Sequence, residues 1–245
     1  MKTIILAGGK GTRILEYTKT IPKPMIRINK KPILIHIMEH YLKFGFKDFY
    51  LALGYKKEII INFFKNFKKL NKPFVYFLKG NKVSITLVDT GKNTLTGGRI
   101  KRMKKFINLN EDFMFTYGDG VSNINLRKLL LFHKRNKKMI TVTAVRPPAR
   151  FGEITILQNR VKTFKEKPQV QSGWINGGFF VANYNFFKLI KNDRTILEKE
   201  PLEKATLKKQ LFAFKHQGFW KCMDTNRDKE VLESIFKKKS FEKKK

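Results

Sequence analysis

The sequence predicts an α/β protein built on a doubly wound, mostly parallel, Rossmann-like sheet, with an extra mixed β region in the C-terminal half. Short apolar runs alternate with helix-like patterns over the first 145 residues, and several of the runs end in glycine. Beyond Pro147 and Pro148, strand-like runs follow one another too closely for helical crossovers. The chain has 245 residues, 42% of them apolar, which is enough to bury one substantial core.

The first elements follow from local patterns. Residues 3–7 form a short β-rich run that ends in glycines. Residues 33–44 have apolar side chains at helical spacing, and Gly45 closes the pattern. Residues 49–53 predict a strand that Gly54 closes, and residues 58–67 predict a helix with aromatic side chains on one face.

The alternation continues through the middle of the chain. Residues 84–88 predict a strand, and residues 98–107 a basic helix. An apolar strand follows at 113–117 and ends in a Gly-Asp-Gly turn. Residues 126–135 then predict a helix and residues 140–145 another strand. In such a sheet ligands bind beyond the carboxyl ends of the strands, so both glycine-rich turns are candidate sites.

The C-terminal half has a different pattern. Strands are expected at residues 152–157, 161–165 and 175–182, close together in the sequence. Helices are expected at 195–209 and 226–238, and residues 237–245 are expected to form a basic, solvated tail.

The charge of +34 indicates affinity for anions. A nucleic-acid-binding protein is one interpretation, but lysine is scattered over the whole chain in short clusters, without Arg-rich stripes and interleaved aromatics. Abundant Lys, Asn, Ile and Phe also fit a genome rich in A and T. We therefore expect no specific nucleic acid as partner, and phosphorylated small molecules instead.

Location and redox state follow from what the sequence contains. No apolar run approaches the roughly 18–20 residues of a membrane span, and the N-terminal run is too short for a signal peptide. A single cysteine, Cys222, excludes an intrachain disulfide. We expect a cytoplasmic protein without a membrane partner.

The loop Gly8-Gly9-Lys10-Gly11-Thr12-Arg13 is suited to phosphate. Glycines let backbone N–H groups approach a polyphosphate closely, Thr12 adds a hydroxyl, and Arg13 offers a planar fork. Ten residues later Lys23 stands between two prolines, which stiffen its backbone and suit a cation that stabilises a transferring phosphoryl group. The loop lacks the ending of a P-loop and the third glycine of a dinucleotide fingerprint.

The run Leu6 to Met25, LAGGKGTRILEYTKTIPKPM, resembles the signature of the sugar-1-phosphate nucleotidyltransferases. The likeness covers nearly the whole chain and is strongest to the glucose-1-phosphate cytidylyltransferase group. It rests further on these stretches: Leu87 to Gly91, Thr96 to Arg99, Phe115 to Gly120, Arg150 to Gly152, Glu166 to Pro168, Ile175 to Phe180, Gly218 to Trp220 and Met223 to Asp228. The segment 70–86 is shorter than the corresponding segment in that group.

The resemblance implies the reaction CTP + α-D-glucose 1-phosphate → CDP-glucose + diphosphate, in nucleotide-sugar and lipopolysaccharide O-antigen synthesis. It implies Mg²⁺ held by Asp119 and Asp224, and catalytic roles for Arg13 and Lys23. For Asp119 the competing interpretation is a turn residue, and for Asp224 an N-cap of the last helix.

The resemblance also implies two substrate sites. The residues implied for the nucleotide are Leu6, Ala7, Gly8, Gly9, Lys10, Gly11, Thr12, Arg13, Lys23, Thr94, Gly98, Arg99 and Gly118. Those implied for the sugar phosphate are Gly152, Glu166, Lys167 and Asn176. Cytosine offers acceptors at O2 and N3, so we expect Arg99 to read the base, against the simpler interpretation of a surface arginine on a basic helix.

The expected organisation is one nucleotidyltransferase domain over residues 1–236. In it, residues 1–145 bind the nucleotide and residues 146–236 bind the sugar phosphate and metal. We also expect a homo-oligomer. Three alternatives stay open: a thymidylyl- or uridylyltransferase acting on another sugar 1-phosphate, a binding module that has lost catalysis, and a basic scaffold that binds RNA through its lysines.

Overall fold

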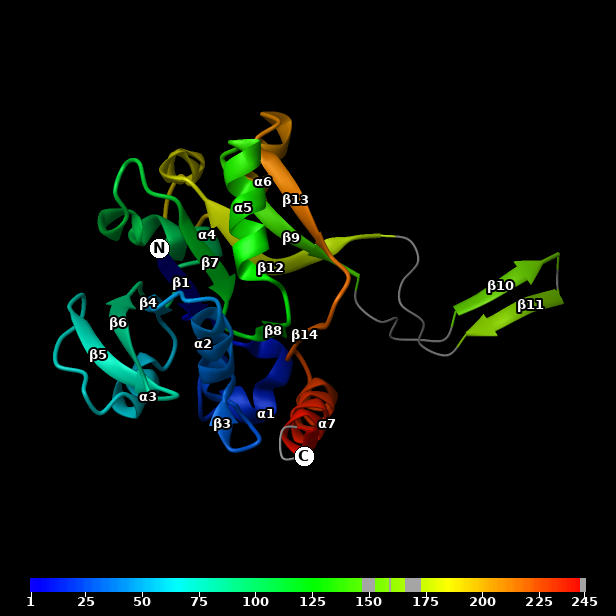
Figure 1. Ribbon diagram of the computed structural model, residues 1–245, viewed down its shortest axis with the longest axis horizontal. Coiled ribbons are helices and arrows are strands. Elements are labelled where there is room, and N and C mark those ends of the chain that lie inside the picture. The colour runs from blue at the N-terminus through cyan, green and yellow to red at the C-terminus, as the bar shows by residue number, and fades with distance from the viewer. Residues whose placement is uncertain (147–152, 159, 166–172, 243–245) are drawn as a thin grey trace.

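A computed structural model describes residues 1–146, 153–158, 160–165 and 173–242 (Figure 1). Its centre is an eight-stranded sheet with the order β13-β9-β12-β7-β1-β4-β6-β5. Neighbouring strands are parallel from β7 through β1 and β4 to β6, whereas β12 is antiparallel to both β7 and β9, and β5 to β6. The predicted class, a mostly parallel sheet with mixed strands in the C-terminal half, is confirmed.

The elements follow the predicted alternation closely. The strands are β1 (Lys2–Ala7), β2 (Arg27–Ile28), β3 (Lys31–Pro32), β4 (Asp48–Leu53), β5 (Pro73–Leu78), β6 (Asn81–Asp89), β7 (Phe113–Tyr117), β8 (Gly120–Ser122), β9 (Ile140–Val145), β10 (Glu153–Leu157), β11 (Arg160–Lys165), β12 (Ile175–Ala182), β13 (Leu211–His216) and β14 (Trp220–Cys222). The α-helices are α1 (Leu15–Thr18), α2 (Ile33–Lys43), α3 (Lys57–Phe63), α4 (Thr96–Arg102), α5 (Leu126–Asn136), α6 (Glu200–Leu207) and α7 (Asn226–Glu242). Four 3₁₀ helices are η1 (Thr12–Ile14), η2 (Lys23–Met25), η3 (Lys104–Phe106) and η4 (Tyr184–Leu189) among the described residues.

Several predicted boundaries are wrong. The helix expected at 58–67 ends at Phe63, because Phe64 leaves helical geometry and packs in the core beside the rings of Phe74 and Tyr76. The helix expected at 195–209 begins only at Glu200, and β5 and β13 were not predicted. Helix α7 continues to Glu242, so most of the segment expected as a solvated tail is helical.

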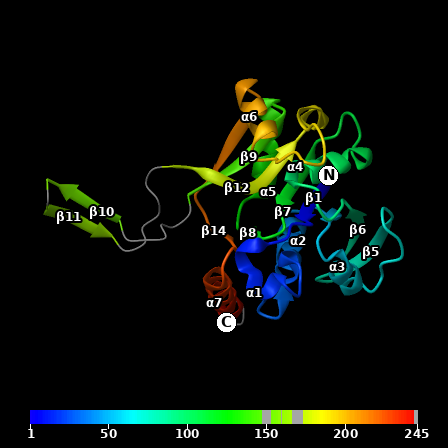
Figure 2. The same ribbon diagram turned by 180° about the vertical axis from the view of Figure 1, so that it is seen from behind.

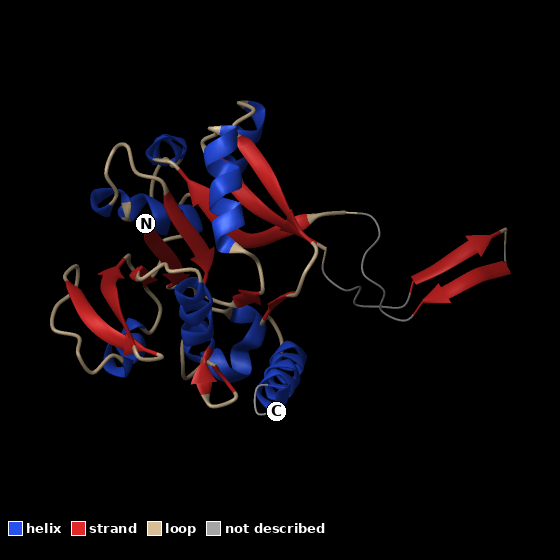
Figure 3. Cartoon of the chain, in the orientation of Figure 1, coloured by secondary structure: helices blue, strands red, loops and turns tan. Residues whose placement is uncertain are grey.

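Both faces of the sheet are covered, which explains the continuous apolar run of β1. Ile5 and Ala7 face a core shared with α2, α3 and α5, whereas Ile4 and Leu6 face a second core beneath α4 and α6. Figures 1 and 2 show these helices on opposite faces, and Figure 3 shows the layers as helix, sheet and helix. The carboxyl ends of β1, β4, β6 and β7 therefore meet at one edge of the sheet.

A small two-stranded pair brings the C-terminal segment to that edge. Strand β14 pairs antiparallel with β8, so that Cys222 lies opposite Gly120. The N–H of Met223 donates to the carbonyl of Asp119 at 2.9 Å. This pairing places Asp224 beside Asp119, although more than a hundred residues separate them. Among the described residues, no helix is long and apolar enough to cross a membrane.

Candidate active site

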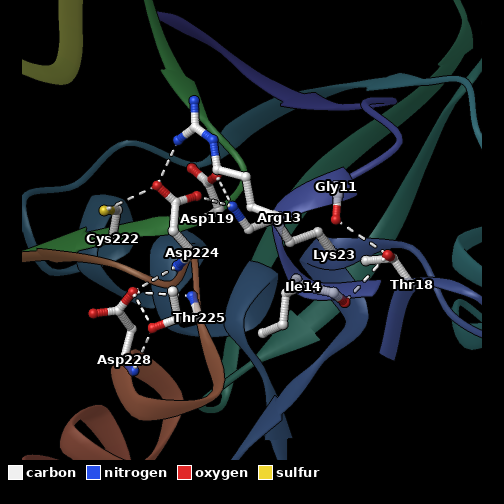
Figure 4. A network of polar contacts seen from close by, with 10 residues as sticks. All are labelled: Gly11, Arg13, Ile14, Thr18, Lys23, Asp119, Cys222, Asp224, Thr225 and Asp228. Atoms are coloured by element: carbon white, nitrogen blue, oxygen red, sulfur yellow. Dashed lines mark hydrogen bonds and ion pairs between the residues drawn. The ribbon is translucent and has the colours of Figure 1, made fainter. Parts of the chain in front are cut away.

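The glycine-rich loop leaves β1 and turns into η1. Gly11 has φ +65°, in the left-handed region that favours glycine, and a Cβ there would lie 2.8 Å from Cγ2 of Thr18. The hydroxyl of Thr18 donates to the carbonyl of Gly11 at 3.1 Å and to that of Ile14 at 3.2 Å (Figure 4). The helix α1, which follows the loop, therefore fixes the loop through Thr18. Gly9 stays open, because a Cβ there would meet no further described residue within 4 Å.

Lys23 begins the short helix η2, as its position between two prolines suggests. Pro22 has an extended backbone, and its carbonyl accepts a hydrogen bond from the N–H of Met25 at 2.8 Å. The carbonyl of Lys23 accepts a hydrogen bond from the N–H of Ile26. The Lys23 side chain is buried, with 8% of the residue exposed. Its backbone is thus held rigidly, as the sequence predicted.

Lys23 joins the two predicted metal carboxylates. Its Nζ lies 2.7 Å from Oδ2 of Asp119 and 2.6 Å from Oδ1 of Asp224 (Figure 4). Arg13 reaches Oδ2 of Asp224 at 2.7 Å from the other side, with most of its side chain in solvent. Two cations and two carboxylates, from four separate segments, therefore converge on one point.

The charges stabilise one another. Burial disfavours the Lys23 ammonium, but Asp119 and Asp224 outweigh burial and raise the pKa of Lys23 above its usual range. Burial also acts against ionised Asp224, but Lys23 and Arg13 hold the pKa of that carboxyl below its usual range. A hydrogen bond and the charge of Asp224 raise the pKa of Arg13. Lys23, Asp224 and Arg13 are therefore all ionised at neutral pH.

Cys222 is a neighbour of this cluster. Its Sγ lies 3.7 Å from Oδ2 of Asp224. Burial, followed by the carboxylate of Asp224, raises the pKa of the thiol to about 11. A thiol with this pKa is a poor nucleophile at neutral pH, because only the thiolate attacks.

The start of α7 has a cap that fixes Asp224. The Asp228 carboxylate accepts from the N–H of Thr225 at 3.0 Å and from that of Asp224 at 3.1 Å. The N–H of Asp228 in turn donates to the Thr225 hydroxyl at 3.2 Å, which completes a capping box. The N-cap is thus Thr225, not Asp224, and the Asp224 carboxylate is left to meet Lys23 and Arg13.

A cavity of about 550 Å³ opens above this cluster. The predicted residues that line it are Leu6, Gly9, Lys10, Gly11, Thr12, Arg13, Lys23, Thr94, Arg99, Gly118, Asp119 and Asp224. Ala7, Gly8 and Gly98 do not line it, and neither does Asn176, although Asn176 donates to the hydroxyl of Tyr117, which does. Gly152, Glu166 and Lys167 lie outside the described residues.

The stretch Thr96 to Arg99 packs against residues 193–197, and the interpretation of Arg99 as a surface arginine is wrong. The N–H groups of Gly97 and Gly98 both donate to the carbonyl of Thr195, and a Cβ on Gly98 would lie 2.5 Å from Asp193. The absence of side chains at Gly97 and Gly98 therefore lets the 193–197 segment pack against helix α4. Arg99 is 3% exposed and donates to main-chain carbonyls and to Thr90, although it lies in the cavity wall.

Sequence reasoning missed several residues of the cavity. Pro24, Lys92, Asn93, Leu95, Thr96 and Tyr117 also line it. Lys92 and Asn93 follow β6 closely and Tyr117 ends β7, so the rule that ligands bind at strand ends could have found them. Tyr117 donates to Glu198 at 2.5 Å, and no local pattern points to Glu198.

The two carboxylates suit a hard cation. Asp119 and Asp224 present oxygen atoms, which Mg²⁺ prefers, and Mg²⁺ is often held by one or two carboxylates together with substrate phosphates. Within the described residues there is no group of three or more His, Cys, Asp or Glu side chains placed to hold a metal. The two carboxylates are oxygen donors of the kind that fit Mg²⁺.

Comparison with known proteins decides the family. Residues 2–225 match the family model described as nucleotidyl transferase. The chain belongs to the nucleotidyl transferase family. It is 44% identical to glucose-1-phosphate cytidylyltransferase of Salmonella typhimurium over 248 residues, which cover 97% of this chain and 96% of the relative. This nucleotidyl transferase thus aligns with a curated family member along nearly its whole length.

Solved structures share the fold. A UDP-glucose pyrophosphorylase complexed with UDP-glucose superposes with a TM-score of 0.72 at 19% identity, covering 97% of this chain and 98% of that one. HddC from Yersinia pseudotuberculosis superposes with a TM-score of 0.70 at 24% identity, covering 96% and 99%. At these identities the likeness establishes the nucleotidyl transferase fold alone.

Proposed function

We propose that this nucleotidyl transferase uses CTP and α-D-glucose 1-phosphate and releases CDP-glucose and diphosphate. The observation that carries the proposal is the 44% identity, along nearly the whole chain, to a relative named glucose-1-phosphate cytidylyltransferase. The cationic cavity at the carboxyl ends of the strands supports it, because both substrates are polyanions.

The proposed chemistry needs no general base. An oxygen of the sugar phosphate attacks the α-phosphorus of CTP, the bond between that phosphorus and the bridging β-phosphate oxygen breaks, and diphosphate leaves with the bonding electrons. A phosphate monoester has its second pKa near about 6, so the nucleophile is already ionised at neutral pH. Catalysis then consists of holding two anions in line and stabilising their charge.

Lys23 and Arg13 are the residues that we assign to this charge. Lys23 is rigid and buried, so it costs little to keep its ammonium in place as charge moves at the α-phosphorus. Arg13 is exposed at the mouth of the cavity, where its remaining donors can reach phosphate oxygens. The N–H groups of Gly9 to Thr12 would add neutral donors to the triphosphate.

Asp119 and Asp224 would hold Mg²⁺ in the complex with substrate. The ion would neutralise phosphate charge and activate the α-phosphorus. Since Lys23 holds both carboxylates at 2.7 and 2.6 Å, the chain itself keeps them close together. Gly152, Glu166, Lys167 and Asn176 are the residues that we propose for the sugar phosphate, with Thr94 on the nucleotide side.

Diphosphate release tests the proposal. The purified protein would be assayed with CTP, UTP, dTTP, GTP and ATP, each with glucose 1-phosphate, galactose 1-phosphate and mannose 1-phosphate, at several Mg²⁺ concentrations. We expect the highest kcat/KM for CTP with glucose 1-phosphate. A clear preference for dTTP or UTP would replace the cytidylyl assignment with one of the alternatives, and no turnover together with salt-sensitive RNA binding would favour the scaffold.

Two further proposals concern the protein in the cell. We propose a homo-oligomer, which light scattering would test, and a cytoplasmic location, which cell fractionation would test.

A further inference from the structure

Arg99 connects both walls of the cavity. Its Nη2 donates to the carbonyl of Gly8, in the glycine-rich loop, at 2.8 Å. Its Nη1 donates to the carbonyl of Gly91, in the turn after β6, at 2.8 Å, and to the Thr90 hydroxyl at 2.6 Å. The first wall carries Gly9 to Arg13 and the second carries Lys92 to Thr96.

A third strand end joins the same guanidinium. Nη1 also lies 3.0 Å from the carbonyl of Leu53, the last residue of β4. Strands β1, β4 and β6 are neighbours in the sheet, so Arg99 is bonded to the carboxyl end of three adjacent parallel strands. Four carbonyl oxygens and one hydroxyl therefore accept hydrogen bonds from the two Nη atoms of Arg99.

Glycines make room for this arrangement. A Cβ on Gly54 would lie 2.3 Å from Nη1 of Arg99, and its three nearest neighbours would all be guanidinium atoms. Gly54 does not have a positive φ, so alanine fits its backbone, and it does not line the cavity. A methyl group at Gly54 would therefore displace the guanidinium. The substitution changes none of the residues that line the cavity.

We propose that Arg99 is a positioning residue that sets the distance between the glycine-rich loop and the turn after β6, and does not read the base directly. The effect on the substrate is indirect: it places the N–H groups of residues 9–12 opposite Lys92 and Thr94. The inference rests on the proposed function for the identity of the ligand, a nucleoside triphosphate, but its geometry does not depend on which base is used.

Two variants of different kinds test this role. Arg99→Lys keeps a cation but cannot span Gly8 and Gly91, since one ammonium nitrogen replaces the planar fork. Gly54→Ala keeps Arg99 but displaces it. We expect both to raise KM for CTP and for UTP by the same factor, roughly tenfold or more, with KM for the sugar phosphate unchanged. In the Arg99→Ala background, Gly54→Ala should have no further effect, because its methyl group then meets no guanidinium.

A neighbouring arginine supplies the matched control. Arg102 lies on the same helix and pairs with Asp193 at 2.5 Å at the surface. Arg102→Lys should leave both KM values unchanged. Circular dichroism of each variant shows whether it is folded, and Gly54→Ala, as the mildest change, keeps the test open if Arg99→Ala does not fold.

Measurements of CTP binding and of hydrogen exchange test the inference even if the proposed function is wrong. Calorimetric titration with CTP alone, and hydrogen exchange over residues 8–14 and 89–94, need no turnover. We expect weaker CTP binding and faster exchange in both segments for Arg99→Lys and Gly54→Ala. Direct base reading would instead lower the ratio of kcat/KM for CTP to kcat/KM for UTP toward one in Arg99→Lys and leave this ratio unchanged in Gly54→Ala. That result would overturn the inference. Unchanged binding and exchange in both variants would overturn it as well.

Discussion

Lys23 donates to Asp224 at 2.6 Å, and only 8% of either residue is exposed. The pair connects the short helix η2 to the start of α7, across 201 residues of sequence. This buried ion pair fixes two charged side chains in the wall of the cavity. The first three predictions concern this ion pair and its neighbours.

Lys23→Ala should lower kcat by about 100-fold or more, because we propose that the ammonium stabilises the charge that develops at the α-phosphorus. Lys167→Ala should instead raise KM for the sugar phosphate, since that phosphate changes its charge less during the reaction. Steady-state kinetics with each substrate varied in turn measures both. Reversed signatures would mean that the two ends of the site are exchanged.

Asp119→Ala and Asp224→Ala should each reduce turnover about 100-fold or more, since each removes an oxygen ligand proposed for Mg²⁺. The rate would be measured as a function of Mg²⁺ concentration, with circular dichroism to check the fold. Asp193→Ala, which removes a surface carboxylate, is the control and should have little effect on the rate. Near-normal activity of either site variant at limiting Mg²⁺ would refute the metal assignment.

The acid limit of stability should depend on Asp224. Lys23 and Arg13 hold the pKa of this carboxyl below its usual range, so it binds its proton more readily in the unfolded chain than in the folded one. Its contribution to the free energy of unfolding is therefore fully present above the unfolded pKa, about 3.9, and is lost as pH falls through the lower folded pKa. Urea unfolding between pH 2.5 and 6 would show a shallower acid loss in Asp224→Asn. The same slope as in the wild type would contradict the pairing.

The fold could be predicted from the sequence where local patterns determine it. Strand β1 lies between two cores, so its unbroken apolar run was sufficient, and α2 ends beside Gly45 as its pattern indicated. Strand β5 was missed because Pro73 opens it and its side chains alternate between partly covered and exposed, which is typical of an edge strand. Its partner β6, not its own pattern, makes it a strand.

The same limit applies to the site. Gly11, Lys23 and Asp119 stand in short motifs whose chemistry is visible locally, and they converge as expected. The surroundings of Arg99 were not predictable, because its partners Gly8, Leu53 and Gly91 lie on three strand ends that only the sheet order brings together. Glu198 was missed because its partners, Thr96 and Tyr117, lie 102 and 81 residues away in the sequence.

The capping box at α7 should matter for both stability and rate. Thr225→Ala removes the hydroxyl that accepts from the N–H of Asp228, which should cost about 1 kcal/mol of the free energy of unfolding. Because the adjacent Asp224 depends on this turn for its direction, the rate should also fall, whereas Thr225→Ser should retain both. Chemical unfolding and diphosphate release measure the two effects. Loss of stability with an unchanged rate would separate the cap from the positioning of Asp224.

The last prediction concerns Tyr117, which lines the cavity and is hydrogen-bonded to Asn176. Its hydroxyl donates to Glu198 at 2.5 Å and accepts from Asn176 at 3.2 Å. Gly178, with φ +82°, is needed beneath it, since a Cβ there would lie 2.5 Å from the Tyr117 ring. Gly178 therefore leaves room for the ring, and the Tyr117 hydroxyl bonds to Asn176, a residue proposed for the sugar phosphate.

Tyr117→Phe keeps the ring and removes only the hydroxyl. Asn176 then loses its acceptor, so we expect KM for the sugar phosphate to rise by about two- to tenfold, the usual worth of one hydrogen bond, with KM for CTP nearly unchanged. Glu198→Gln is the matched variant, because an amide oxygen can still accept from Tyr117 and should preserve KM. Kinetics with both substrates varied decides the matter. An equal rise of both KM values would mean that Tyr117 supports the whole cavity and not the sugar side.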